Sequence, residues 1–476
     1  MPPAVITSSP NTEPEGHESS QMQTLSAMPS TISEPSDNYY DVIIVGGGFA
    51  GVGAAIGARQ ALPSGGRILL LESESCLGGA GTHRGVYSLC GLYTCTELPR
   101  RTVGAIWDDL HKLLLETGAT GLKPTRHRGV FQIFEPEGMK HALDMLLAER
   151  DIDVILHAPV VSATRCPDSN QVTSVAVQER RGTTTFHGRA FVDASGDGDL
   201  AFHGGASVRY GNHGTINLGT LSTRFGGLNN PKANPSSELW KQAILAAKAA
   251  DPSLAARLPK VSSVQLRLPQ SGDVTTYLAS ATYDARDARS ITRAEQVGKA
   301  QALEYLRILR RLPGHESMYL VSSGPNFGTR ESRHVNARYQ LRAEDVEQRT
   351  RFDDTIAVCG WGMEWHDETA ENWASTFTLP PHETFEIPLR CLVSIDTPNL
   401  LAAGRCLDAD RRAGSAARVM GTGLATGQAA GVAAGLMAAS AGEGSGKFPD
   451  VKEVQRILRC NGAILDSDEL PEGIKI

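Results

Sequence analysis

The sequence lacks the paired cysteines from which zinc sites and dithiol relays are built. Its eight cysteines are spread along 476 residues, and no two of them have C-x-x-C spacing. A surplus of basic residues is also missing. The formal net charge is -7, so the chain has no electrostatic footprint for nucleic acid. A metal centre, a dithiol centre and a nucleic-acid partner are therefore not predicted.

Long runs of large apolar side chains are absent as well. Residues 419–442 carry no charge, but they are mainly Gly, Ala and Thr, whereas a membrane span is richer in Leu, Ile, Val and Phe. The glycines of this segment recur every four residues on one helical face, at Gly423, Gly427, Gly431 and Gly435. The segment is therefore predicted to be a buried helix that approaches another backbone closely, and no membrane partner is expected.

The first residues contain no basic stretch followed by an apolar core, so no secretory signal is predicted. Residues 1–37 are rich in Ser, Pro, Thr and Glu, a composition typical of a disordered tail. We therefore expect a cytoplasmic protein with reduced thiols.

What is present is an ordinary globular composition, with 41% hydrophobic and 21% charged residues and enough length for two or three domains. The run DVIIV (residues 41–45) predicts a buried parallel strand. A helix over residues 51–62 and a second strand over residues 67–72 follow it. Together these three segments form a βαβ unit.

Further strands and helices extend this pattern. Buried strands are expected at residues 191–194 and 399–403. A small antiparallel sheet is expected from residues 153–157, 172–177 and 183–190. Helices are expected at residues 103–116, 139–150, 238–250 and 291–311.

The chain is therefore predicted to leave its first domain and to return to it. The predicted fold class is α/β, with a three-layer Rossmann-type domain formed by residues 38–210 and 385–442. An α+β substrate or cap domain is inserted over residues 211–384, which hold four of the five tryptophans. Residues 443–476 form a C-terminal extension.

The sequence GGGFAG (residues 46–51) matches G-x-G-x-x-G between a predicted strand and a predicted helix. In this pattern Gly46 permits a tight turn, Gly48 lets the backbone approach a pyrophosphate, and Gly51 lets helix and strand pack closely. The helix amino terminus offers N–H groups to the phosphates. Glu72 ends the next strand and would accept hydrogen bonds from a ribose. A dinucleotide site is therefore predicted, but the pattern alone does not distinguish FAD from NAD.

Several segments together resemble the FAD-dependent oxidoreductases of the glutathione-reductase-like superfamily, and more narrowly the widespread group named only FAD-dependent oxidoreductase. The matching segments are DVIIVGGGFAGVGAA (41–55), LLLESESCLGGAGTHRG (69–85), FVDASGDGDLAFHGGA (191–206), GTRESRHVNARY (328–339) and FEIPLRCLVS…NLLAAGRCLDA…RVMGTGLATGQAAG (385–431). Many flavoproteins share the first segment, whereas the combination is specific. It spans nearly the whole of the chain that is expected to be ordered.

The resemblance implies that FAD lies extended along the first domain, with its pyrophosphate at residues 46–51. The start of the Gly-rich helix would point at the pyrimidine edge of the flavin, where the helix dipole stabilises the negative charge of the reduced ring. The cofactor-binding residues expected from the resemblance are Gly46, Gly48, Phe49, Ala50, Gly51, Glu72, Gly78, Gly79, Val161, Ser195, Gly196, Asp197, Gly404, Arg405, Asp408, Gly421 and Gly423.

Catalytic candidates are titratable groups near the flavin, because the cofactor transfers the electrons and the protein adds orientation, charge and an acid or base. His83 would be a general acid or base, or a covalent tether for the flavin. Arg330 or Arg333 would clamp a substrate carboxylate, the alternative being an internal ion-pair network. Arg418, just before the Gly-rich helix, would contact flavin or substrate.

The junction of the two predicted domains supplies two more candidates. His382 and Glu383 precede the return strand, where a cleft between domains commonly binds ligands, although a simple loop role is the stronger alternative.

The predicted function is that of an FAD-dependent oxidoreductase acting on a small organic substrate in a specialised biosynthetic pathway, by hydride transfer in dehydrogenation or reduction. No second G-x-G-x-x-G follows a strand, so electrons are expected to be exchanged with oxygen, NAD(P)H or another external carrier. A flavin monooxygenase is the nearest alternative. A flavin-free binding module on the same fold is an alternative of another class.

Overall fold

The computed structural model describes residues 38–124, 129–228, 235–369, 372, 374–377, 379, 384–440 and 448–475. The tail predicted over residues 1–37 lies outside the described residues, as do His382 and Glu383.

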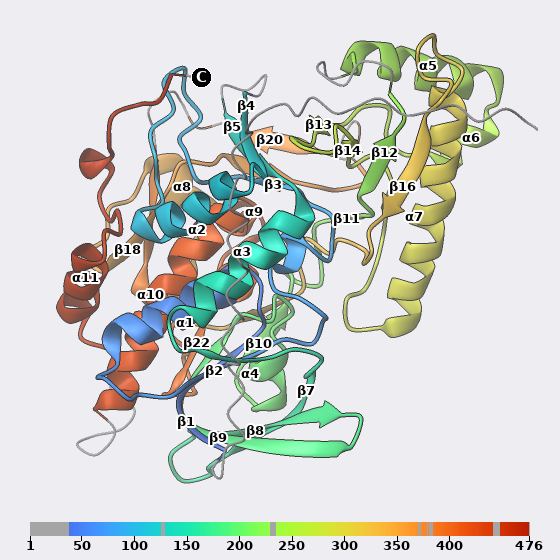
Figure 1. The fold of residues 1–476 in the computed structure, drawn as a ribbon. Coiled ribbons are helices and arrows are strands. Elements are labelled where there is room, and N and C mark those ends of the chain that lie inside the picture. The colour runs from blue at the N-terminus through green and yellow to red at the C-terminus, as the bar shows by residue number, and fades with distance from the viewer. Residues whose placement is uncertain are drawn as a thin grey trace, which may run out of the picture.

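A mainly parallel sheet forms the centre of the molecule (Figure 1). The strand β1 (Tyr39–Val45) pairs in parallel with β2 (Ile68–Leu71) on one side and with β9 (Gly182–Asp193) on the other. Beyond them, β6 (Asp153–Ile155) pairs with β2, and β22 (Leu400–Ala402) pairs with β9. The βαβ unit and the returning strand predicted near residue 400 are thus confirmed.

The far end of this sheet is antiparallel. The strands β7 (Val160–Arg165) and β8 (Val172–Glu179) form a meander with the first half of β9. The antiparallel prediction is therefore correct for β8 and β9 but wrong for residues 153–157, because β6 is a parallel strand beside β2. The predicted break before residue 191 is also absent, since the single long strand β9 runs from the meander into the buried sheet.

Helices cover one face of the parallel sheet and the meander covers the other, which gives three layers. Alternate residues of β1 face opposite layers: Val42 and Ile44 lie in the core with the helices, whereas Ile43 and Val45 lie in the core with β8. The helices of this layer are α1 (Phe49–Ala61), α2 (Ala105–Glu116), α3 (Pro136–Ala148) and α10 (Met420–Ala439).

The Gly-rich segment is the buried helix α10, as predicted, and it packs directly on α1. A Cβ added to Gly427 would lie 2.0 Å from the carbonyl oxygen of Ala50, and one added to Gly431 would lie 1.9 Å from that of Ala54. The contact is reciprocal, since a Cβ on Gly57 of α1 would lie 2.0 Å from a carbonyl oxygen of α10. Glycine is therefore required on both helices. No helix in the part of the chain that the structure describes combines the length and apolar character needed to cross a membrane.

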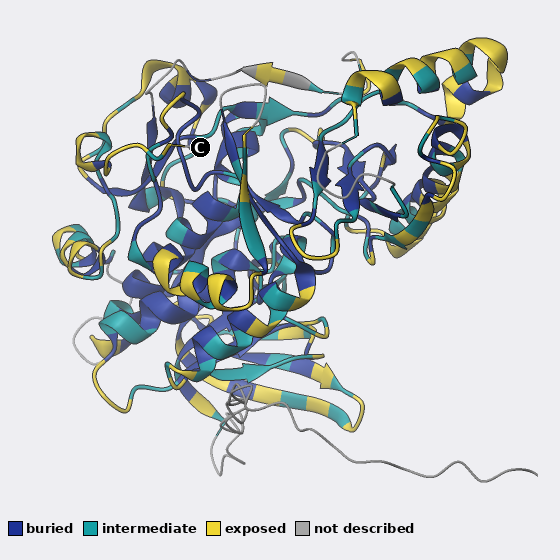
Figure 2. Ribbon diagram, turned by 45° about the horizontal axis from the view of Figure 1, so that its top comes forward, coloured by how far each residue is buried: buried dark blue, intermediate teal, exposed yellow. Residues whose placement is uncertain are grey.

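A second, antiparallel sheet lies beside the first and has its own core. Its strands, in spatial order, are β13 (Gln265–Arg267), β14 (Val274–Thr276), β12 (Thr223–Gly226) and β16 (Tyr319–Ser323). The helices α5 (Ser237–Ala250), α6 (Ser253–Arg257) and α7 (Ala288–Leu309) pack around it. Figure 2 shows that the outer surfaces of these helices are exposed while their inner surfaces are buried. The division into domains predicted from the sequence remains a prediction.

Short elements connect and cover the two sheets. The strands are β3 (Ser88–Leu89), β4 (Thr120–Pro124), β5 (Val130–Phe134), β10 (Val208–Tyr210), β11 (Gly219–Thr220), β15 (Ser280–Ala281), β17 (Arg333–Val335), β18 (Thr355–Cys359), β19 (Met363–Trp365), β20 (Ser375–Phe377) and β21 (Phe385–Pro388). The helices are α4 (Asp199–His203), α8 (Ala343–Gln348), α9 (Arg411–Ala417) and α11 (Val451–Cys460).

Candidate active site

The turn between β1 and α1 contains three glycines, and a side chain at each position would have a different structural consequence. Gly46 has a φ of +101°, and a Cβ there would lie 2.4 Å from the carbonyl oxygen of Ala194. A Cβ on Gly51 would lie 1.7 Å from the carbonyl oxygen of Gly46. A Cβ on Gly48, in contrast, would meet no atom closer than the Cα of Gly79 at 3.8 Å. Packing thus explains Gly46 and Gly51, whereas Gly48 leaves space that the protein itself does not fill.

Two helix amino termini open toward this space without a capping side chain. Neither α1 nor α10 has a side-chain cap or an acidic residue in its first turn. In contrast, Asp410 caps α9 and Asp450 caps α11. The free N–H groups and the positive dipole ends of α1 and α10 are therefore available to a negatively charged ligand.

A first cavity of about 330 Å³ lies at the carboxyl ends of β1, β2 and β9 and reaches both helix amino termini. This edge of a parallel sheet is the usual place for a ligand. Most of the predicted cofactor residues line it, namely Gly46, Gly48, Phe49, Ala50, Glu72, Gly78, Gly79, Ser195, Gly196, Asp197, Gly404, Arg405 and Gly423.

The carboxylate of Glu72 is held at the wall of the first cavity by backbone donors. Its Oε2 accepts a hydrogen bond from the Gly47 N–H at 2.6 Å, and its Oε1 accepts one from the Glu74 N–H at 2.9 Å. The strand and the turn therefore fix the position of the acidic residue that the dinucleotide pattern requires.

Two predicted cofactor residues point elsewhere. The side chain of Val161 is exposed, and its neighbour Val160 lines the first cavity instead, because successive side chains of a strand alternate between its faces. Asp408 is buried beside Arg209, with 2.5 Å between Oδ1 and Nη1, and accepts a hydrogen bond from the Ala337 N–H. Asp408 therefore ties segments of the chain together and does not reach the cavity.

Gly421 and Gly51 also lie behind the cavity wall, where they serve packing. A Cβ on Gly421 would lie 2.7 Å from the carbonyl oxygen of Cys90. Gly421 therefore allows α10 to approach the segment after β3, while Gly423, two residues later, faces the cavity.

A second cavity of about 210 Å³ adjoins the first. The residues that line both cavities are Ala80, Arg84, Thr329, Arg330, Arg418 and Met420. The second cavity also reaches strands of the second sheet region and the segment around β19, so it lies where distant parts of the chain meet. Most of its lining escaped the sequence analysis, because the residues come from separate segments that form no motif.

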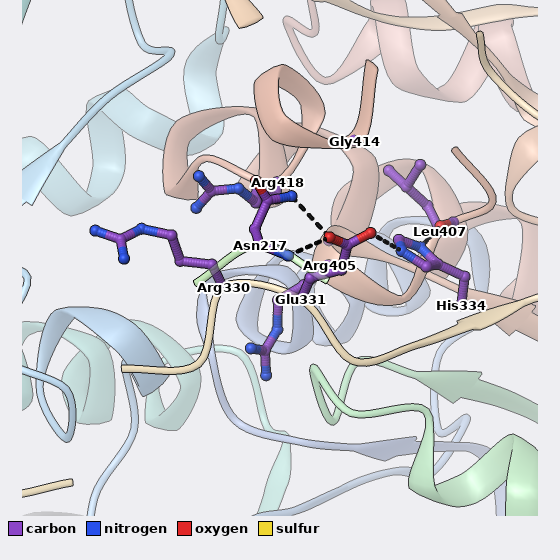
Figure 3. Close-up of a pocket in the computed structure, with 9 residues that line it drawn as sticks. Asn217, Arg330, Glu331, His334, Arg405, Leu407, Gly414 and Arg418 are labelled. Atoms are coloured by element: carbon purple, nitrogen blue, oxygen red, sulfur yellow. Dashed lines mark hydrogen bonds and ion pairs between the residues drawn. The ribbon is translucent and has the colours of Figure 1, made fainter. Parts of the chain in front are cut away.

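Arg330 and Arg418 are the two cations at the junction that were expected from the sequence. Arg330 donates through Nη1 to the Leu218 carbonyl oxygen at 2.7 Å and to the Thr220 hydroxyl at 2.6 Å. Burial, and secondarily the charge of Arg418, lower the pKa of Arg330 to about 10, so that it remains a cation at neutral pH. Figure 3 shows both side chains directed to the same side, away from Glu331.

The other members of the charged segment after residue 328 have structural partners. Glu331 accepts hydrogen bonds from the N–H and the side-chain amide of Asn217, at 2.8 and 2.7 Å, and lies 3.1 Å from Nε2 of His334 (Figure 3). Arg333 forms an ion pair with Asp199 at 3.0 Å and does not line either cavity. The structure therefore separates Arg330 from Arg333, which the sequence presented as equivalent.

Asp197 links two further arginines at the wall of the first cavity. Its carboxylate lies 3.0 Å from Nη2 of Arg405 and 3.5 Å from Nη2 of Arg84. Burial by itself would raise the pKa of Asp197, but Arg405 and Arg84 outweigh it and lower that pKa below its ordinary value. Asp197 is therefore a carboxylate that orients two cations.

His83 is buried at the wall of the first cavity, near the junction. Its Nε2 lies 2.7 Å from the carbonyl oxygen of Cys76, which makes Nε2 the protonated ring nitrogen. Burial lowers the pKa of His83, but the hydrogen bonds with Cys76 more than compensate and raise it above the ordinary value.

A second histidine, which the sequence analysis missed, lines the second cavity. Nε2 of His366 lies 3.3 Å from Oε1 of Glu364, and both residues line the cavity. Burial and the charge of Arg330 lower the pKa of His366, so its imidazole is neutral at neutral pH. Glu364 and His366 are two positions apart at β19, and residues i and i+2 of a strand share a face, so the sequence did contain a signal that the two side chains lie together.

Comparisons with known proteins identify a family whose model matches this chain. A family model described as FAD dependent oxidoreductase matches residues 41–458. No curated protein matches the chain.

Three solved structures are similar to the chain at low sequence identity. A geranylgeranyl bacteriochlorophyll reductase-like protein from Thermoplasma acidophilum is 12% identical over 89% of this chain and 83% of that chain, with a TM-score of 0.43. The anhydrotetracycline hydroxylase OxyS from Streptomyces rimosus is 14% identical over 89% of this chain and 66% of that chain, with a TM-score of 0.40. The myxobacterial chondrochloren halogenase CndH is 16% identical over 89% and 79%, with a TM-score of 0.40.

Proposed function

The chain belongs to the FAD-dependent oxidoreductase family, and from this premise we propose that it transfers hydride between FAD in the first cavity and a small organic substrate in the second. The observation that carries the proposal is the junction between the cavities. Six residues line both, so a cofactor in the first cavity would be within reach of a substrate in the second. Binding two reactants in adjoining spaces converts a bimolecular step into an effectively unimolecular one, which can lower the barrier by about 7–11 kcal/mol.

The first cavity has the features that FAD requires. The open space at Gly48 and the uncapped amino terminus of α1 suit a pyrophosphate. The fixed carboxylate of Glu72 suits a ribose, and the uncapped amino terminus of α10 suits the electron-rich edge of the flavin. When bound, FAD supplies the two-electron chemistry.

The second cavity provides the groups that act on the substrate. Arg330 and Arg418 place positive charge at the junction with the first cavity. We assign a role in proton transfer to the pair formed by His366 and Glu364, whose side chains lie 3.3 Å apart in the second cavity. His83, on the cofactor side, remains a candidate acid, base or covalent tether.

The electron partner is proposed to be external, either oxygen or NAD(P)H. The test is an anaerobic titration of the purified protein, in which the visible flavin bands are followed on addition of NADH, NADPH or candidate substrates, and then after air is admitted. Bleaching followed by recovery supports the proposal. A flavin that none of these donors reduces, and that does not recover in air after chemical reduction, contradicts it.

The attachment of the cofactor is tested separately by acid precipitation. If the yellow colour remains in the pellet and is lost from the pellet of a His83→Ala variant, His83 is the covalent tether. If the colour is released to the supernatant, FAD is held non-covalently and His83 is tested as an acid or base.

We further propose that the reaction belongs to a specialised biosynthetic pathway in the cytoplasm. Deletion of the gene is then expected to change the profile of specialised metabolites and to leave growth unchanged. A growth defect with an unchanged metabolite profile would contradict this placement.

A further inference from the structure

The second cavity combines an apolar, aromatic wall with a cationic end. Phe131 and Trp361 line it with their ring centroids 5.7 Å apart and their planes tilted by 41°. Aliphatic and thioether side chains extend this wall, from Val86, Val264, Val419 and Met420. A wall of this kind gains free energy by burying an apolar body, and aromatic faces favour a ring.

The cationic end has a hydrogen-bond donor that the described residues do not use. The Nε of Arg418 is buried and has no hydrogen-bond partner among the residues that the structure describes. Leaving such a group unpaired costs free energy, and an acceptor on a ligand would remove that cost.

The charges at this end do not balance. Arg84 shares the carboxylate of Asp197 with Arg405, and Arg330 and Arg418 face the single carboxylate of Glu364 within the second cavity. The carboxylate of Glu331 is occupied by Asn217 and His334. Since His366 is neutral and adds no charge, the positive charges at this end exceed the negative ones and favour an anionic ligand. A guanidinium suits a planar carboxylate, which accepts two parallel hydrogen bonds.

We infer that the second cavity takes an organic carboxylate with a ring-containing apolar body, whose carboxylate pairs with Arg330 and Arg418 while its ring lies against Phe131 and Trp361. This inference rests on the proposed function only in identifying the second cavity as the substrate site. The carboxylate is a binding handle, and the bond that is oxidised or reduced lies elsewhere on the molecule.

The test compares two probes of the same shape and different charge. Benzoate and benzamide are titrated separately into the purified holoprotein, and binding is followed by calorimetry and by tryptophan fluorescence, since Trp361 lines the cavity. Benzoate is expected to bind roughly tenfold or more tightly than benzamide, because hydrogen bonds to charged groups contribute more than neutral ones.

Variants locate the effect at the two arginines. Arg330→Gln and Arg418→Gln are each expected to weaken benzoate binding roughly tenfold while leaving benzamide binding unchanged. Arg330→Lys and Arg418→Lys, which keep the charge, should recover part of the loss. Arg333→Gln is the matched control, since Arg333 belongs to the same segment but pairs with Asp199 away from the second cavity. The flavin content of every variant is measured from its visible spectrum.

The outcomes separate this inference from the proposed function. If the protein holds FAD but binds benzoate no better than benzamide, or if the glutamine variants retain the preference, the inference is wrong while the proposed function stands. If the glutamine variants lose FAD and the lysine variants restore FAD without any preference for benzoate, the arginines serve the cofactor and the inference is overturned. If the wild-type protein holds no FAD, the proposed function fails, whereas a benzoate preference that depends on Arg330 would still support an anion site.

Discussion

At the scale of single residues, the turn after β1 shows how identical residues are retained for different reasons. Gly46 and Gly51 are required because any side chain would collide with backbone atoms of the protein. Gly48 is not required in this way. A ligand that approaches the backbone closely would explain why position 48 is a glycine, which protein packing alone does not explain.

Glu72 allows a direct prediction about cofactor affinity. Its carboxylate is held by the Gly47 N–H at 2.6 Å and lines the first cavity, so Glu72→Gln keeps the shape and removes the charge. The dissociation constant for FAD is expected to rise roughly tenfold or more, because a hydrogen bond to a charged group contributes about 1.5–3 kcal/mol. Fluorescence quenching of FAD during titration into the apoprotein measures this change. Glu137→Gln on the exposed surface of α3 is the control. If the two variants bind FAD with equal affinity, Glu72 does not contribute to FAD binding.

Because Lys260 is buried, we predict that the free energy of unfolding depends on pH. Burial, and secondarily Arg330, lower its pKa in the folded protein to about 7. Between that pH and the ordinary range of lysine, the unfolded chain binds more protons than the folded one, so the free energy of unfolding rises with pH, by at most about 1.4 kcal/mol per pH unit. Urea unfolding at pH 7 and pH 9 measures this rise.

The Lys260→Met variant isolates the contribution of that lysine. The wild-type protein should gain stability from pH 7 to pH 9 relative to Lys260→Met, since methionine carries no proton to lose. Lys452→Met, at an exposed position on α11, should behave as the wild type does. Parallel pH profiles for wild type and Lys260→Met would show that Lys260 has an unshifted pKa.

At the scale of elements, the Gly-rich helix α10 has two functions along its length. Its middle packs against α1, where a Cβ on Gly431 would lie 1.9 Å from the Ala54 carbonyl oxygen. Its amino-terminal turn faces the first cavity, where a Cβ on Gly423 would meet no atom closer than 3.9 Å. Stability and cofactor binding should therefore separate along one helix.

Two alanine substitutions in α10 test this separation. Gly431→Ala is expected to lower stability, because overpacking costs about 1–3 kcal/mol and exceeds the gain of up to about 1 kcal/mol in helix propensity. Gly423→Ala is expected to keep or slightly raise the melting temperature of the apoprotein and to weaken FAD binding. Thermal unfolding of both apoproteins and FAD titration measure the two effects. If both variants lose stability, or both lose only FAD affinity, then stability and cofactor binding are not separated along α10.

The elements also show where sequence reasoning succeeds. The β1–α1–β2 unit and α10 follow from local patterns, because their contacts are made by glycines at fixed spacing. The strand β6 was assigned an antiparallel pairing in place of its parallel pairing with β2, because three half-buried residues carry no sign of their partner. Val161 was one residue out of register with the cavity, an error that reverses the face of a strand.

At the scale of the whole molecule, the candidate site is assembled from segments that are far apart in the sequence. The first cavity could largely be predicted, since its residues belong to motifs at the ends of parallel strands. The second cavity could not, because Tyr277, Trp361 and His366 meet Arg418 only through the tertiary fold. Asp408 is an error in the other direction. It lies in a segment that matches the family and was predicted to bind the cofactor, but its carboxylate pairs with Arg209 inside the protein.

The central claim is that the first cavity holds FAD against the backbone at Gly48, and the most direct test is the flavin content of Gly48→Val beside that of the wild-type protein. Both proteins are purified, supplied with FAD, freed of excess cofactor and compared by their visible spectra, with thermal unfolding of the apoproteins as the check on folding. A Cβ at this position meets no atom closer than 3.8 Å, and the thermal unfolding of the apoprotein shows whether the γ-methyl groups of the valine are also accommodated. The account predicts a yellow wild-type protein and a stably folded, colourless variant. A wild-type protein that takes up no FAD, or a folded variant that retains as much flavin as the wild type, would contradict it.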